Sequence, residues 1–124
     1  MAFFCFDSAA RALRPLADCN GRDTGDPVGL TGLVTQTARG EVATVDLRVN
    51  VVLDADVRVP GYTFVRVGEV PTALVVPPDD PSVTYIADFG SRRVEWVPTD
   101  RFRPELVSTA TVTAGFVSLP DGPV

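Results

Sequence analysis

The chain is 124 residues long, enough for one modest domain with an apolar core of its own. Hydrophobic residues make up 45% of the sequence and charged residues 22%, a balance typical of folded rather than disordered proteins. The formal net charge of −5 argues against nucleic acid as a partner, because contact with phosphates requires a basic surface.

The sequence contains no histidine, and this excludes several kinds of catalytic and metal site within the chain. Neither a Ser-His-Asp nor a Cys-His arrangement can form, and no metal can be held by imidazole nitrogens. Hydroxyl residues such as Thr24 and Ser91 therefore have no evident base to activate them. We predict no catalytic residue, no metal site and no cofactor for this chain.

Residues 1–29 differ from the rest and are predicted to form an irregular N-terminal extension with at most a short helix. Residues 9–16 have the composition of a helix, but Pro15 limits its length. Residues 18–29 are rich in Gly, Asp, Asn and Pro, which indicates turns. Cys5 and Cys19 can close one small loop as a disulfide in an oxidising compartment, and would stay as thiols in the cytosol.

No apolar run approaches the roughly 18 residues that a transmembrane helix needs, so no transmembrane segment is predicted. The apolar run at the start is short, is interrupted by Asp7 and follows no basic residue, so we do not interpret it as a signal peptide. These residues leave the compartment open.

From residue 30 to residue 124 the sequence predicts β-structure throughout. Apolar and polar residues alternate as they do in strands with one buried face, and no helical period is present. Short runs at close, even spacing are typical of a sandwich, a barrel or a propeller. The predicted strands are LTGLVTQ, EVATVDL, DADVRV, YTFVRVG, TALVVPP, VTYIAD, RRVEWVP, STATVTA and GFVSLP.

The chain matches itself at an offset of 52 residues. The matched pairs are Leu33-Val34 with Tyr85-Ile86, Val42 with Val94, Val45 with Val97, Phe64 with Phe116, Val65 with Val117 and Pro71 with Pro123. Valine matches have little weight in a valine-rich chain, but the Phe and Pro matches in ungapped order favour true repetition. The hairpin copies are residues 32–47 and 84–99. A period near 50 residues is typical of propeller blades of four antiparallel strands.

The second copy, TYIADFGSRRVEWV, resembles the middle hairpin of NHL-type and YVTN-type β-propeller repeats. Residues 70–76 resemble the innermost strand of such a blade, and residues 78–81 stand where the family has a Pro-Asp-Gly turn. The resemblance covers about residues 30–124 and implies about two blades. The first blade is incomplete, because residues 19–27 are too polar for an innermost strand. A small β-sandwich is the alternative fold.

A closed propeller needs roughly four to eight blades, so the resemblance implies that further chain or other subunits complete the ring. The function it implies is a non-catalytic scaffold or protein-binding surface, with other protein chains or further copies of the chain as partners. The alternatives are part of a lactonase-like or lyase-like propeller enzyme and an oligomerising two-blade lectin that binds carbohydrate. The resemblance slightly favours an extracytoplasmic compartment.

The turn of the second hairpin is the candidate binding site, with Asp88, Phe89, Arg92 and Arg93 as its residues. Such a turn lies at the rim of a propeller, where partners dock, and Arg beside an aromatic residue is a common hot-spot composition. The alternative is that Asp88 pairs with an Arg across the two strands. Trp96 is predicted to make a buried contact between blades rather than a platform for sugar.

Two pairs of carboxylates are interpreted as surface features. Asp54 and Asp56 lie on one side of a predicted strand, but no loop supplies the six or more oxygens that calcium requires. Asp79 and Asp80 lie between prolines and predict a turn rather than an acid–base pair.

Overall fold

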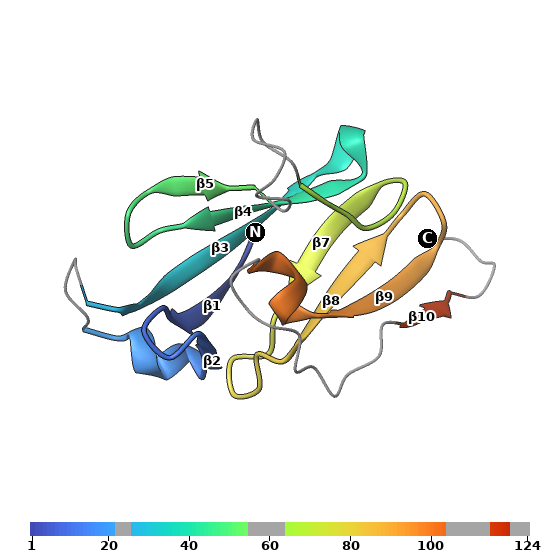
Figure 1. The fold of residues 1–124 in the computed structure, drawn as a ribbon. Coiled ribbons are helices and arrows are strands. Elements are labelled where there is room, and N and C mark those ends of the chain that lie inside the picture. Colours follow the sequence, from blue (N-terminus) through green and yellow to red (C-terminus); the bar gives the residue numbers. More distant parts are fainter. Residues whose placement is uncertain (22–25, 55–63, 104–114, 120–124) are drawn as a thin grey trace.

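The computed structural model describes residues 1–21, 26–54, 64–103 and 115–119. These residues form two antiparallel sheets, one of six strands and one of four, which lie side by side (Figure 1). The prediction of an all-β chain is confirmed. Both sheets are open in the described residues, because each has a first and a last strand.

Sheet A, the larger sheet, has the strand order β2-β1-β3-β4-β5, and β6 also pairs with β4. Every pairing in it is antiparallel. Its strands are β1 (Ala2–Asp7), β2 (Ala12–Arg14), β3 (Val28–Gln36), β4 (Glu41–Asp46), β5 (Val51–Leu53) and β6 (Val65–Arg66).

Sheet B is a simple meander in which each strand pairs with the next along the chain. Its strands are β7 (Pro71–Val75), β8 (Val83–Asp88), β9 (Arg93–Pro98) and β10 (Gly115–Ser118). Three short 3₁₀ segments complete the described elements: η1 (Leu16–Cys19), η2 (Thr37–Arg39) and η3 (Thr99–Phe102).

The prediction of an irregular N-terminal extension is wrong for residues 2–7. These residues form β1, which lies between β2 and β3 and buries Phe4 and Phe6. In place of the short helix expected over residues 9–16, the chain has β2 followed by η1. The apolar run lacks strand-like alternation because Cys5, on the opposite side of β1 from Phe4 and Phe6, is buried as well. β1 pairs with β3, which is distant from it in the sequence, and a local pattern does not indicate such a pairing.

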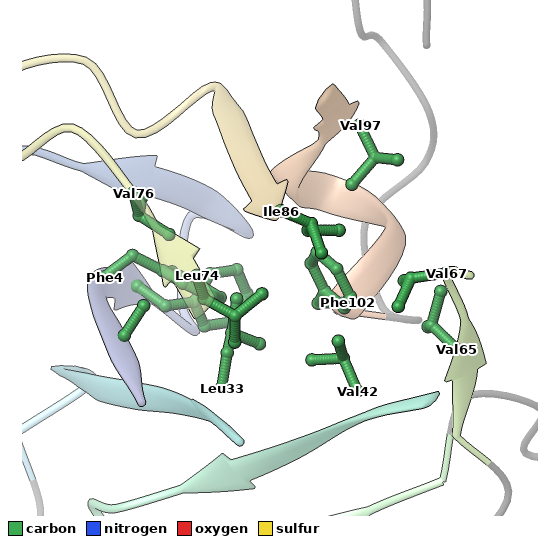
Figure 2. Packing of buried hydrophobic residues seen from close by; sticks show 12 residues of the cluster. Phe4, Leu33, Val42, Val65, Val67, Leu74, Val76, Ile86, Val97 and Phe102 are labelled. Atoms are coloured by element: carbon green, nitrogen blue, oxygen red, sulfur yellow. The ribbon is translucent and has the colours of Figure 1, made fainter. Parts of the chain in front are cut away.

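The apolar core lies between the two sheets. Sheet A contributes Phe4, Leu33 and Val42, and these side chains meet Ile86 of sheet B and Phe102 of η3 (Figure 2). All five are at most 1% exposed, so the two sheets share one core rather than having one each.

Most predicted strands from residue 30 onward correspond to strands of the structure. The predicted hairpins over residues 32–47 and 84–99 are the pairs β3/β4 and β8/β9. The sequence did not indicate β5, which begins at Val51, before the run that starts at Asp54. The predicted strand STATVTA, and all of DADVRV after Asp54, lie outside the described residues.

The 52-residue offset preserves the pairing of the two hairpins. Leu33 lies opposite Thr44 in β3/β4, and the residues 52 positions later, Tyr85 and Trp96, lie opposite each other in β8/β9. The two copies therefore agree in strand register as well as in sequence order.

The third strand of each copy follows the same offset. Val42 lies opposite Val65 in β4/β6, and Val94 lies opposite Val117 in β9/β10. Both members of the second pair stand 52 residues after the first pair. Strands β3, β4 and β6 thus correspond in register to β8, β9 and β10.

Candidate functional site

Asp88 ends β8 and is almost fully buried, with 2% of its surface exposed. Its Oδ1 accepts the backbone N–H of Val70 at 2.9 Å and that of Gly90 at 3.1 Å. Its Oδ2 accepts the N–H of Glu69 at 3.2 Å and the hydroxyl of Ser91. The carboxylate therefore links the β8–β9 turn to the segment that leads into β7.

This network changes the acidity of two carboxyl groups. Burial raises the pKa of Asp88, but the hydrogen bonds from Ser91, Val70 and Glu69 outweigh burial and bring the pKa below its ordinary value. The pKa of Glu95 is raised, first by burial and then by the charge of Asp88, against a smaller opposite effect of Arg93. Asp88 is consequently held as a carboxylate at neutral pH.

The other predicted binding residues differ in their exposure. Phe89 is 64% exposed at the tip of the turn, and Arg92 beside it is exposed as well. Arg93 is half-buried, and its guanidinium lies 4.5 Å from the ring centroid of Phe116 on β10. The structure thus leaves Phe89 and Arg92 accessible at the turn, while Asp88 is turned inward and Arg93 lies over the sheet.

Among the residues that the structure describes, the same turn occurs three times. Each copy begins with an aspartate that ends a strand, and that aspartate accepts the backbone N–H two residues later. Four residues after the aspartate stands a non-glycine residue with positive φ, and the next strand starts at the following position. The pairs are Asp7 with Arg11 (φ 52), Asp46 with Asn50 (φ 54) and Asp88 with Arg92 (φ 53). Repetition identifies the turn as a structural device, and a search for strand-ending aspartates would have found it.

The outer face of sheet B, the face turned away from sheet A, is apolar. We define it by Ala73, Val75, Tyr85, Val94, Trp96 and Val117, which alternate with the core residues of the same strands. Val75, Tyr85 and Val117 are all well exposed. The indole of Trp96 is half-buried and lies over Gly115, where an added Cβ would be 2.5 Å from the ring. Trp96 therefore packs along its own sheet and borders an exposed apolar face.

The outer face of sheet A is apolar as well. We define it by Phe3, Gly32, Val34, Val45 and Val52, which follow from the pairings of β1, β3, β4 and β5. Phe3 and Val52 are each 39% exposed, and Val34 and Val45 are half-buried. Both sheets thus expose an apolar surface on the side away from their shared core.

Residues related by the offset differ in burial. Leu33 is 0% exposed and corresponds to Tyr85 at 41%, while Val65 is 9% exposed and corresponds to Val117 at 55%. The core-facing side of sheet A therefore corresponds to the outer face of sheet B. Leu33 and Val65, which are buried in sheet A, thus correspond to exposed side chains of sheet B.

Arg103 is a buried cation that the sequence did not identify. Its guanidinium lies 3.9 Å from the ring centroid of Phe6, and its Nη1 lies 3.5 Å from Oδ2 of Asp46. Nη1 also donates to Oγ1 of Thr31 at 3.2 Å. Because Arg103 directly follows η3 and the other three residues belong to sheet A, this cluster fastens η3 to sheet A.

A disulfide joins Cys5 of β1 to Cys19 of η1, with their Cα atoms 5.7 Å apart. It closes the small N-terminal loop that the sequence allows. The bridge holds η1 against the side of β1 that faces away from the core, which accounts for the burial of Cys5.

The acidic pairs form no metal site in the described residues, where no group of three Cys, Asp or Glu side chains gathers. Asp56 and Thr24 lie outside the described residues. Asp79 and Asp80 are both exposed, and Asp80 accepts the N–H of Ser82 at 3.2 Å and its hydroxyl at 2.7 Å. Both hydrogen bonds lower the pKa of Asp80, and the bond from the Ser82 hydroxyl has the larger effect. Such bonds from an aspartate to a residue two positions later are typical of turns.

In the part of the chain that the structure describes, no helix is long and apolar enough to cross a bilayer. No protein family, curated protein or solved structure matches the chain.

Proposed function

We propose that the chain is a non-catalytic β-propeller-like module whose outer sheet faces dock onto other protein surfaces. One observation carries the proposal: the outer face of sheet B corresponds in register to the side of sheet A that is buried. A surface that repeats a buried one and is itself exposed and apolar is suited to a protein partner.

The topology of sheet B supports the propeller-like part of this proposal. Four antiparallel strands that follow one another across a sheet are the plan of a propeller blade. The core that sheets A and B share and the resemblance of β8/β9 to NHL-type and YVTN-type hairpins agree with it.

The β8–β9 turn adds a rim to the proposed docking surface. Phe89 and Arg92 are exposed there, next to the end of the strand that carries Tyr85. An aromatic and an arginine side chain at the edge of an apolar face are common in protein interfaces. Asp88 supports this rim from inside and does not itself contact a partner.

The disulfide supports an extracytoplasmic location, because bridges of this kind persist in oxidising compartments and are rare in the cytosol. Partners of the module are accordingly expected among proteins of the periplasm or the cell surface.

Site-specific photo-cross-linking in the native host tests the docking function. A photoreactive amino acid is placed at Tyr85, at Phe89 or, as a control, at the exposed turn residue Asp79. Mass spectrometry then identifies the adducts. The proposal expects adducts with a defined protein chain from position 85, and not from position 79. Equal yields from positions 85 and 79 would overturn it, and saccharide adducts would favour the lectin alternative instead.

A further inference from the structure

We propose that the partner of this docking surface is a second copy of the same chain, bound head to tail. The outer face of sheet B of one copy packs on the outer face of sheet A of the next. This inference rests on the proposed docking function and specifies the partner and the contact.

The first half of the contact follows from the inner side of sheet A. Within one chain, Leu33, Val42 and Val65 are buried where sheet A packs on sheet B. The residues that stand 52 positions later in the sequence are Tyr85, Val94 and Val117. These three residues lie on the outer face of sheet B in the same mutual register.

The second half of the contact follows from the inner side of sheet B. Ile86 and Val97 are the residues of β8 and β9 that enter the core. The same offset, applied backwards, leads to Val34 and Val45 on the outer face of sheet A. Each chain therefore has, on its two outer faces, both surfaces that are needed to repeat the contact between sheets A and B with another copy.

The chemistry of the two outer faces is compatible with burial. One cross-strand row of sheet B consists of Val75, Tyr85, Trp96 and Gly115, and one row of sheet A consists of Phe3, Gly32, Val45 and Val52. Neither row contains a charged side chain. Bringing the rows together removes apolar surface from water, which is favourable, without the cost of desolvating an ion.

The contact joins two different faces, so it is heterologous and passes from copy to copy. It closes a ring when the rotation per copy allows closure. With two sheets in each chain, about two to four copies supply the roughly four to eight sheets of a propeller ring.

Sedimentation velocity on two complementary variants tests this geometry. Tyr85→Glu places a charge on the outer face of sheet B, and Val52→Glu does the same on the outer face of sheet A. Both residues are about two-fifths exposed, at 41% and 39%, so the fold should tolerate the change. Far-UV circular dichroism checks this, and Val75→Glu replaces Tyr85→Glu if that variant does not fold. The matched controls are Pro78→Glu and Val49→Glu, at exposed residues of the β7–β8 and β4–β5 turns.

The wild-type chain and both controls are expected to associate, and each face variant alone is expected to be a monomer. Mixing the two face variants in equal amounts should yield a heterodimer of twice the monomer mass, because one intact interface remains between them. Dimers of Val52→Glu alone would indicate a symmetric contact between B faces and overturn the head-to-tail geometry.

A monomeric wild-type chain at all concentrations would overturn self-docking. If cross-links from position 85 then reach another protein, the docking function stands and only the identity of the partner was wrong. If position 85 gives no specific cross-link either, both proposals fail.

Discussion

The carboxylate of Asp88 accepts the backbone N–H of Val70 at 2.9 Å and so ties the end of β8 to the segment before β7. Gly68 lies against the same carboxylate, and a Cβ added there would be 2.3 Å from its Oδ2. The sequence indicated Asp88 as a binding residue or a partner of an arginine. In the structure its carboxylate also holds the backbone of the turn that carries the exposed Phe89.

We expect Asp88→Asn to lower the free energy of unfolding by about 2–3 kcal/mol, because buried N–H donors lose a charged acceptor. Urea unfolding followed by fluorescence measures the change. Asp79→Asn is the matched control, since Asp79 is exposed in a turn, and should stay within about 0.5 kcal/mol of the wild type. Equal effects of the two substitutions would contradict the role of the Asp88 network.

The free energy of unfolding should fall as the pH drops below about 4, the ordinary range of aspartate pKa values. The pKa values of Asp7 and Asp88 are lowered in the folded chain, that of Asp7 chiefly by hydrogen bonds from the N–H of Ala10 and from Arg14. The unfolded state therefore takes up these protons first, and the stability that both groups add above their unfolded pKa is lost as the pH falls through their folded pKa.

The raised pKa of Glu95 acts in the opposite direction, since the folded state binds that proton first. Urea midpoints between about pH 7 and 2.5 measure the net dependence. Asp88→Asn should flatten the acid side of the profile relative to the wild type. If Asp88→Asn leaves this slope unaltered, the carboxylate of Asp88 does not contribute to the loss of stability at low pH.

Gly115→Ala should displace the indole of Trp96 and destabilise sheet B by about 1–3 kcal/mol, as overpacking does. The added Cβ would lie 2.5 Å from the indole ring, so either the indole or β10 has to shift. Trp96 is the one tryptophan of the chain, and its emission is expected to move to longer wavelength as it becomes more exposed.

The control for Gly115→Ala is Ser118→Ala at the other end of the same strand. Ser118 is exposed and lies on the side of β10 opposite to Gly115, so the tryptophan emission should be unchanged. An unchanged emission in Gly115→Ala, or the same change in both variants, would show that the indole does not lie over β10 in solution.

Arg103→Met should lower the free energy of unfolding by about 3–5 kcal/mol. The substitution removes a buried cation and leaves the buried carboxylate of Asp46 with one partner fewer. Arg101→Met is the control, since Arg101 is exposed two residues earlier in η3. Thermal unfolding of the two variants measures the difference. If Arg103→Met unfolds at the wild-type temperature, the cluster does not fasten η3 to sheet A.

The alternation of apolar and polar residues predicted strands that bury one face. It failed for β1, which is buried on both faces. β8 alternates between core and surface, and it lies where the sequence predicted it. β1 was missed because Phe4, Phe6 and Cys5 are all buried, by the core on one side and by the disulfide-linked η1 on the other. Arg103 was missed because its three partners come from strands of sheet A, far from it in the sequence.

Alternation and turn residues act over a few positions, so the amino-acid pattern was enough to predict the β class, the two hairpins and the 52-residue offset between them. Which side of each hairpin is buried depends on the three-dimensional fold. Leu33 and Tyr85 occupy the same place in their two hairpins, yet one is covered by a sheet and the other faces outward. Burial depends on which surfaces meet in space, and the same apolar side chain serves as core or as docking surface according to whether a second sheet covers it.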